Sequence, residues 1–259
     1  MTRRARPKLA VFKLASCDGC QLTLLDCEDE LLAIAGAVRI AHFSEASSRR
    51  LRGPYDVALV EGSVSTARDA ARIVELRESA RILVTLGACA TAGGVQALRN
   101  LHREGELARL VYPQPELLDS LACSTPISAH VKVDVELRGC PIDKRQLLQT
   151  LADLLAGRVP RPTTAPVCLE CKLRGVTCVV VARGASCLGP VTVGGCGALC
   201  PAHHRGCFGC FGPTRAPATE PLSKVFLARG ARPGEVARLY TTIQAGAPAF
   251  AAEAARLGD

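Results

Sequence analysis

The chain has 259 residues, a formal net charge of +8 and 48% hydrophobic residues. This length suits one large domain or two modest ones with a proper core. Aromatic residues make up only 3% and tryptophan is absent, so the stacking platform of single-strand nucleic-acid-binding proteins is missing. We therefore interpret the positive charge, carried mostly by arginine, as a solvated surface or a subunit contact and expect no nucleic-acid partner.

Fourteen cysteines are the most unusual feature of the composition. Disulfide-rich scaffolds are usually shorter than about 100 residues. The apolar run after Arg3-Arg4 is too short for an export signal and ends at Lys13. No run approaches the roughly 18 apolar residues of a membrane span. We expect a cytoplasmic protein without a membrane span, in which clustered thiols bind metal.

Strand and helix patterns alternate along the first 155 residues. Apolar runs predict strands at 8–15, 37–43, 56–60, 82–86 and 132–137. Amphipathic patterns predict helices at 22–35, 67–79 and 144–155. This alternation is typical of an α/β fold with a parallel sheet and helices on both faces. A proline-rich boundary at 157–166 precedes an irregular cysteine- and glycine-rich segment, and a helical stretch at 233–257 closes the chain.

Four cysteines follow predicted strands directly, on glycine-containing turns. Ligands of an open parallel sheet bind beyond the carboxyl ends of its strands, so these four thiols can converge there. Four thiolates indicate structural zinc or an iron–sulfur cluster. One close pair joined by two distant single cysteines favours a four-iron cluster. The four residues are Cys17, Cys20, Cys89 and Cys140.

Cys27 falls inside a predicted helix and Cys123 in a long loop. Neither position fits the group of four at the strand ends. A free cysteine in such a place is usually a small buried hydrophobe. We therefore expect no ligand role for these two residues.

The other eight cysteines crowd into 43 residues and divide into two sets of four. A sequential division gives Cys168, Cys171, Cys178 and Cys187, followed by Cys196, Cys200, Cys207 and Cys210. In two-cluster ferredoxins one ligand crosses between the clusters, so the division stays open. Two zinc knuckles would give the same count.

The motifs resemble those of [NiFe] hydrogenase small subunits. The match runs over roughly residues 8–155 and consists of Cys17-Asp18-Gly19-Cys20, Gly87-Ala88-Cys89-Ala90-Thr91-Ala92-Gly93 and Gly139-Cys140-Pro141. The cysteine-rich segment is similar to the delta subunits of cytosolic sulfhydrogenases and, less closely, to the gamma subunit of the F420-reducing enzyme. The related complex I subunit carries adjacent cysteines where this chain has Cys17 and Cys20.

The resemblance implies three parts and three [4Fe–4S] clusters. Residues 1–160 would form a flavodoxin-like domain with a proximal cluster on Cys17, Cys20, Cys89 and Cys140. Residues 161–215 would form a small, irregular, ferredoxin-like domain in which the eight later cysteines hold two more clusters, and residues 216–259 a C-terminal helical segment. The chain would contain no catalytic residue. It would relay electrons between a [NiFe] large subunit and subunits that carry flavin, iron–sulfur clusters and the NAD(P) site.

Several polar residues near these sites allow more than one interpretation. Glu61 stands at a strand end and would contact the large subunit or carry protons, or else be an exposed carboxylate capping the next helix. His203 and His204 lie between cysteines, but eight thiols already suffice for two clusters. The alternative function is a zinc-binding interaction or nucleic-acid-binding protein.

Overall fold

A five-stranded parallel sheet organises the first half of the chain. The computed structural model describes residues 6–258. The sheet has the order β2-β1-β3-β4-β5, which is the flavodoxin-like order and confirms the predicted α/β class. The strands are β1 Lys8–Lys13, β2 Arg39–Phe43, β3 Tyr55–Glu61, β4 Ala80–Leu86 and β5 Val135–Leu137.

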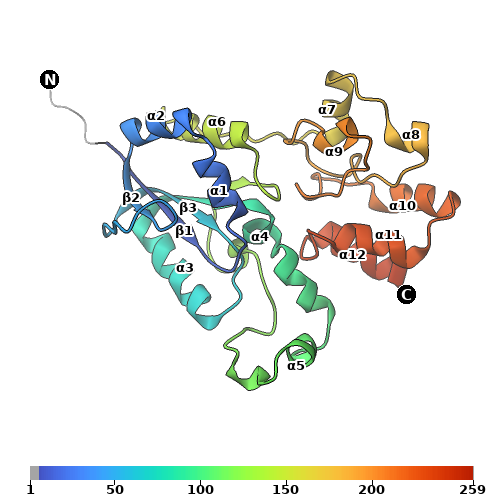
Figure 1. Ribbon diagram of the computed structural model, residues 1–259, viewed down its shortest axis with the longest axis horizontal. Coiled ribbons are helices and arrows are strands. Elements are labelled where there is room, and N and C mark those ends of the chain that lie inside the picture. Colours follow the sequence, from blue (N-terminus) through green and yellow to red (C-terminus); the bar gives the residue numbers. More distant parts are fainter. Residues whose placement is uncertain (1–5, 259) are drawn as a thin grey trace.

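Helices cover both faces of the sheet (Figure 1). On one face, Leu24 of α1, Ile34 of α2 and Leu147 of α6 pack into one apolar core with the strands. On the other face, Ile73 and Leu76 of α3 join a second core. Because both faces are buried, β3 is an almost continuous apolar run, as parallel strands are. These helices are α1 Gly19–Leu25, α2 Asp29–Ala37, α3 Ala67–Ser79 and α6 Lys144–Leu155.

Three predicted elements differ from the structure by more than two residues at an end or by an interruption. The helix expected at 22–35 is two helices, because Glu28 has φ 44° and interrupts the hydrogen-bond ladder between α1 and α2. The strand expected at 132–137 forms only from Val135 to Leu137. The helix expected at 233–257 is likewise divided, into α11 Pro233–Thr241 and α12 Pro248–Gly258.

A long excursion separates β4 from β5, and the sequence patterns do not predict its structure. It contains α4 and α5 and three short 3-10 helices, and α5 projects away from the sheet (Figure 1). Their bounds are α4 Gly87–Ala92, η1 Val95–Leu101, α5 Glu106–Val111, η2 Pro115–Leu117 and η3 Ile127–Ala129. Cys89 lies on the first of these helices, directly after β4.

The cysteine-rich segment packs on the C-terminal helices. Leu188 and Val191 share an apolar core with Phe226, Tyr240 and Phe250. The helices of this half are α7 Val167–Leu173, α8 Val179–Arg183, α9 Leu199–Ala202 and α10 Thr219–Ala228, followed by α11 and α12. The C-terminal helices therefore supply the hydrophobic support that the glycine-rich segment lacks. Within residues 6–258, none of the helices combines the length and apolarity needed to cross a bilayer.

Candidate metal centres

Four cysteines meet at the carboxyl edge of the sheet. Cys17 and Cys20 follow β1, Cys89 follows β4 and Cys140 follows β5. The negative charge of a Cys89 or Cys140 thiolate would raise the pKa of Cys20, and that of Cys17 would raise the pKa of both Cys89 and Cys140. Such mutual effects require the sulfurs to be near one another. We call these residues the strand-end quartet; the structure brings them together as the sequence predicts.

Two glycines make room for the sulfurs of this quartet. A Cβ on Gly87 would collide with Cys20 Sγ, and a Cβ on Gly94 would stand 2.5 Å from Cys89 Sγ. Both glycines have positive φ, at +83° and +61°, which residues with a side chain rarely adopt. The turn after β4 therefore depends on glycine both for its backbone and for the space around the thiols.

Burial opposes ionisation of three thiols of this quartet, those of Cys20, Cys89 and Cys140, while they hold no cation. Removal from water is the largest cause of the raised pKa of Cys20 and of Cys140, and it raises the pKa of Cys89 to about 11. A bound cation reverses this preference, because a thiol that coordinates a metal loses its proton. The site thus combines one buried thiol, two partly buried thiols and the exposed thiol of Cys17.

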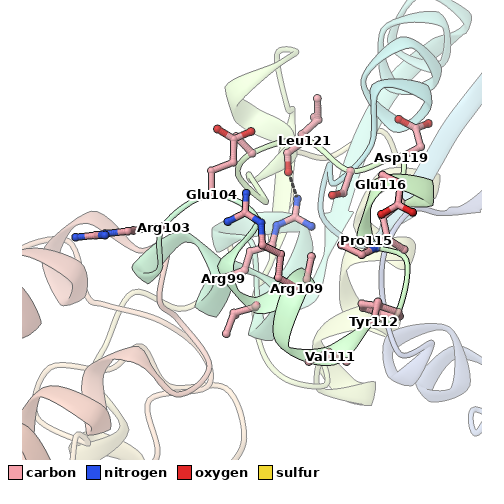
Figure 2. Close-up of a pocket in the computed structure, with 16 residues that line it drawn as sticks. Arg99, Arg103, Glu104, Arg109, Val111, Tyr112, Pro115, Glu116, Asp119 and Leu121 are labelled. Carbon is pink, nitrogen blue, oxygen red and sulfur yellow. Dashed lines mark hydrogen bonds between the residues drawn. The ribbon is translucent and has the colours of Figure 1, made fainter.

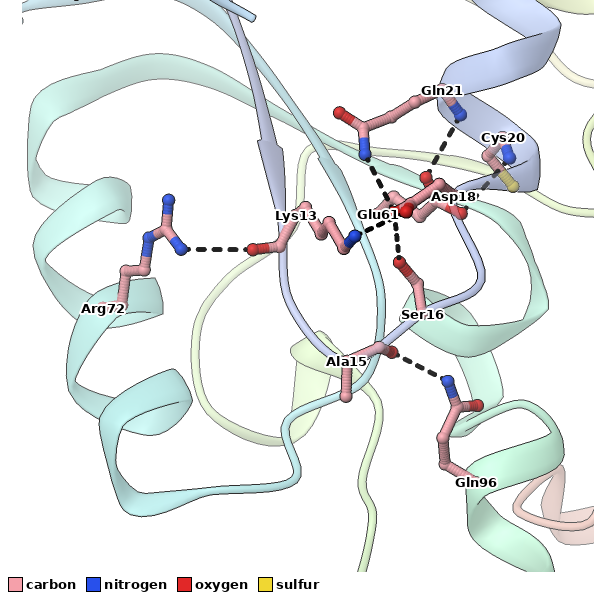
Figure 3. A network of polar contacts seen from close by, with 9 residues as sticks. All are labelled: Lys13, Ala15, Ser16, Asp18, Cys20, Gln21, Glu61, Arg72 and Gln96. Carbon is pink, nitrogen blue, oxygen red and sulfur yellow. Dashed lines mark hydrogen bonds and ion pairs between the residues drawn. The ribbon is translucent and has the colours of Figure 1, made fainter. Parts of the chain in front are cut away.

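Glu61 anchors the helix that carries Cys20. Its carboxylate accepts hydrogen bonds from the backbone N–H groups of Cys20 at 3.2 Å and Gln21 at 3.1 Å (Figure 3). The side chain is buried, with 1% of its surface exposed, so the expectation of an exposed carboxylate capping the following helix is wrong. Burial raises the pKa of Glu61, and the two N–H donors oppose that rise. Glu61 therefore fixes the first turn of α1 beside the thiols.

The eight later cysteines lie close to one another both within the sequential division and across it, since Cys187 has the largest thiolate effect on the raised pKa of Cys207. The charges of Cys187, Cys171 and Cys178 all raise the pKa of Cys168, which burial brings to about 11. We call these four the early quartet. Within the other set, a Cys196 thiolate raises the pKa of Cys200, Cys207 and Cys210. We call Cys196, Cys200, Cys207 and Cys210 the late quartet.

The late quartet lies between the other two. The backbone N–H of Cys140, in the strand-end quartet, donates to the thiol of Cys210, whose pKa burial raises to about 12. On the other side, the backbone N–H of Cys207 donates to Cys187 Sγ of the early quartet at 3.1 Å. The three groups of thiols therefore form one connected series.

Phe211 packs against the backbone on both sides of the contact between Cys140 and Cys210. A Cβ on Gly139 would lie 2.8 Å from Phe211 Cζ, and a Cβ on Gly195 would lie 2.6 Å from Phe211 Cε1. The ring is buried, at 3% exposure. It thus fills the space between the turn that holds Cys140 and the turn that holds Cys196.

Glu170 connects the early quartet to the late one. It lies between Cys168 and Cys171 on α7, and its carboxylate accepts from the backbone N–H groups of Gly195 at 2.7 Å and Ala198 at 3.1 Å. Those two amides flank Cys196. The role is the same as that of Glu61, and its only signal in the sequence is the position of the residue between two cysteines.

The donor set fits iron–sulfur clusters. Backbone N–H groups donate to sulfur at Cys20, Cys187, Cys207 and Cys210, and such hydrogen bonds tune cluster potentials. In the part of the chain that the structure describes, no three His, Cys, Asp or Glu side chains are arranged around a single-ion site. The residues suited to hold clusters are the twelve cysteines of the three quartets.

The two remaining cysteines lie apart from these groups. Cys27 is fully buried among apolar side chains between α1 and α2, and its thiol contacts the Thr23 carbonyl oxygen at 3.4 Å. Cys123 is exposed near the end of the excursion. His203 and His204 are exposed as well.

A cavity of about 760 Å³ lies in the excursion, between η1, α5 and the segment at 115–122. Figure 2 shows Arg99 and Arg109 at its centre, with Arg99 donating to the Leu121 carbonyl oxygen at 2.9 Å. None of its 16 lining residues is a cysteine, so the cavity is no part of the thiol sites.

The sequence of this chain is similar to those of known proteins. Residues 17–154 match the family described as NADH ubiquinone oxidoreductase, 20 Kd subunit. Sulfhydrogenase 2 subunit delta of Pyrococcus furiosus is 42% identical over 207 residues, covering 80% of this chain and 86% of the relative. A vhu subunit of the F420-non-reducing hydrogenase of Methanocaldococcus jannaschii is 31% identical over 236 residues, covering 80% of this chain and 82% of the relative.

One solved structure is also similar to this chain. A chain of an NAD+-reducing [NiFe]-hydrogenase in the H2-reduced state is 35% identical, with a TM-score of 0.56, and the similarity covers 60% of this chain and 94% of that one. The chain therefore belongs to the family of the 20 kDa NADH ubiquinone oxidoreductase subunit and is a [NiFe] hydrogenase small subunit.

Proposed function

We propose that the chain relays electrons between a [NiFe] large subunit and an NAD(P)-linked flavin and iron–sulfur module through three [4Fe–4S] clusters. The connected series of thiols supports this proposal most directly. Cys140 contacts Cys210 of the late quartet, and Cys207 contacts Cys187 of the early quartet. Each cluster held by these residues would therefore lie next to another one, which suits electron transfer between them.

The ligands we assign are the three quartets. The strand-end quartet holds the proximal cluster beside the large subunit, on Cys17, Cys20, Cys89 and Cys140. The late quartet holds the middle cluster, on Cys196, Cys200, Cys207 and Cys210, and the early quartet the last one, on Cys168, Cys171, Cys178 and Cys187. The order in space thus differs from the order in sequence. We further propose that the chain is organised in the parts 1–160, 161–215 and 216–259.

The names of two relatives support our choice of partner at the far end. One delta subunit belongs to an enzyme named as an NAD-reducing hydrogenase, and so does the solved structure. Both are relatives of at least 30% identity. We infer that the early quartet faces the module that reduces NAD(P), within the cytoplasm.

The test is a single cysteine substitution in the assembled enzyme. Cys210→Ser removes a thiol at the link between the strand-end and late quartets. H2-dependent reduction of NAD(P) should fall at least about tenfold, the loss typical even of residues that only support a metal ligand. Cys123→Ser, an exposed cysteine outside the quartets, is the matched control and should keep full activity. Full activity of Cys210→Ser in a complex that contains nickel would contradict the relay.

A further inference from the structure

A small basic cavity lies at the carboxyl ends of β1 and β2, beside the strand-end quartet but without a cysteine in its lining. Its volume is about 180 Å³. A water molecule occupies about 30 Å³ of liquid, so the cavity has room for one small polyatomic ion. The polar side chains that line it include Lys13, Gln21, His42, Ser44, Arg50 and Arg72.

Positive charge predominates in the lining of this cavity. Lys13, Arg50 and Arg72 line it with one acidic residue, Glu45, while the carboxylates of Asp18 and Glu61 lie near Lys13 outside the lining. Lys13 also pairs with Asp18, which lies on the side of the cysteine turn (Figure 3). Within residues 6–258, no carboxylate lies within ion-pair distance of Arg50 or Arg72. Two guanidinium groups are therefore free to bind an anion.

Arg72 is held in place by contacts that leave part of its guanidinium group available. Its Nη1 donates to the Lys13 carbonyl oxygen at 3.2 Å, as Figure 3 shows. Its Cζ lies 5.4 Å from the centroid of the Phe12 ring. A guanidinium group fixed in this way loses little conformational freedom when it binds an anion.

His42 forms the buried wall of the cavity. The side chain is 6% exposed, and its ring stacks on Phe12 with the centroids 4.3 Å apart. Its Nε2 lies 3.4 Å from Ser44 Oγ. Burial lowers the pKa of His42, and the charges of Arg50 and Arg72 lower it further. The same positive potential that opposes a proton on this ring favours an anion in the cavity.

We propose that the cavity binds a small oxyanion, of the phosphate or carboxylate class, between Lys13, Arg50 and Arg72. The guanidinium fork matches two oxygens of either group, and the ammonium adds a third donor. The site stands independently of the clusters, because no cysteine lines it. Lys13 and Gln21 also donate to Asp18 in the turn before α1, so an occupied site would also stabilise that turn.

Isothermal titration of the full-length chain, purified anaerobically, tests the site with inorganic phosphate and with acetate as separate probes. We expect saturable binding of at least one of them; the comparison distinguishes tetrahedral from planar oxyanions. Arg50→Gln should weaken binding about tenfold, the loss of one charge-assisted hydrogen bond. The side chain of Arg50 is exposed, so this change leaves the core intact.

Arg68→Gln is the matched control. Arg68 lies one turn before Arg72 on α3, is exposed and lines no part of the cavity. The Arg68→Gln variant should bind the anion with the same affinity as the unaltered chain. Absence of binding of both anions to the unaltered chain would overturn the proposal. So would equal affinity of Arg50→Gln and Arg68→Gln.

Discussion

At the scale of the residue, glycines shape the strand-end site as much as its cysteines do. Gly87 and Gly94 leave the space that the sulfurs of Cys20 and Cys89 occupy. Their positive φ angles also turn the chain at the end of β4. A cysteine motif without these glycines would not place its thiols in the same way.

Gly87→Ala should therefore damage the strand-end site. A residue with a side chain at positive φ costs about 1–3 kcal/mol of folding free energy, and the new methyl group would displace Cys20. We expect lower stability in denaturant unfolding and loss of the proximal cluster in iron analysis. Gly36→Ala is the control, because Gly36 lies in α2 with open space around it; it should gain roughly 0.5–1 kcal/mol. Unchanged iron content in Gly87→Ala would contradict the packing described.

His42 makes the stability of the chain depend on pH. Its folded-state pKa is lowered from 6.5, first by burial and then by Arg50 and Arg72. Below its ordinary pKa the unfolded chain binds a proton that the folded chain does not bind until its own lower pKa is reached. The contribution of His42 to the free energy of unfolding is therefore fully present above pH 6.5. It is lost as the pH falls through the folded-state pKa.

Thermal unfolding in a phosphate-free buffer measures this dependence. The melting temperature of the unaltered chain should fall more steeply below pH 6.5 than that of His42→Phe, which keeps the aromatic stack on Phe12. Parallel curves for the two proteins would show that His42 is not the group responsible.

At the scale of the element, short cysteine-bearing helices are held by carboxylates from outside. Glu61 binds the start of α1, and Glu170 on α7 binds the turn around Cys196. The helices α7 to α9 have only four to seven residues, too few to be stable alone. Their positions therefore depend on such tertiary hydrogen bonds.

Glu170→Ala should loosen the contact between the early and late quartets. Two backbone N–H groups would lose their acceptor, at about 1–3 kcal/mol for each that stays buried. We expect lower stability and altered magnetic coupling between the two clusters in the EPR spectrum of the reduced protein. Glu170→Gln keeps one acceptor oxygen and should lie between the alanine variant and the unaltered chain. An EPR spectrum of Glu170→Ala identical to that of the unaltered chain would contradict the coupling.

The sequence predicts regular elements better than their interruptions. The bounds of α3 and α6 agree residue for residue with the amphipathic patterns, because those helices cover a buried sheet. The break at Glu28 carries no glycine or proline, so no local signal marks it. The break between α11 and α12 holds Gly246, where a Cβ would collide with the carbonyl oxygen of Ala92. Gly246 and Pro248 are also helix-breaking residues, so a local signal does mark this second break.

Some features of the candidate sites can likewise be predicted from the sequence, and others cannot. The strand-end quartet follows from parallel strands whose ends share one edge, so its convergence could be predicted. The contacts of Glu61, Glu170 and Phe211 depend on how distant turns pack and carry no pattern of their own. Spacing alone also leaves the division of the eight later cysteines open; the charges around Cys168 and Cys210 fit the sequential one, whereas Cys207 contacts Cys187 across it.

At the scale of the whole molecule, the C-terminal helices join the two cysteine-bearing parts. Their core includes Leu188 and Val191 from the cysteine-rich segment and Ala92 from α4, beside the strand-end quartet. Gln244, between α11 and α12, donates to the Cys210 carbonyl oxygen at 2.7 Å. The final segment therefore sets the distance between the sheet edge and the late quartet.

The central claim is that this one chain holds three four-iron clusters on twelve cysteines. Iron and zinc analysis of the anaerobically purified protein, with EPR of its reduced form, tests that claim most directly. We expect about twelve irons per chain, four for each cluster, no stoichiometric zinc, and signals from interacting clusters. A colourless protein that contains zinc, or one with iron for a single cluster only, would contradict it.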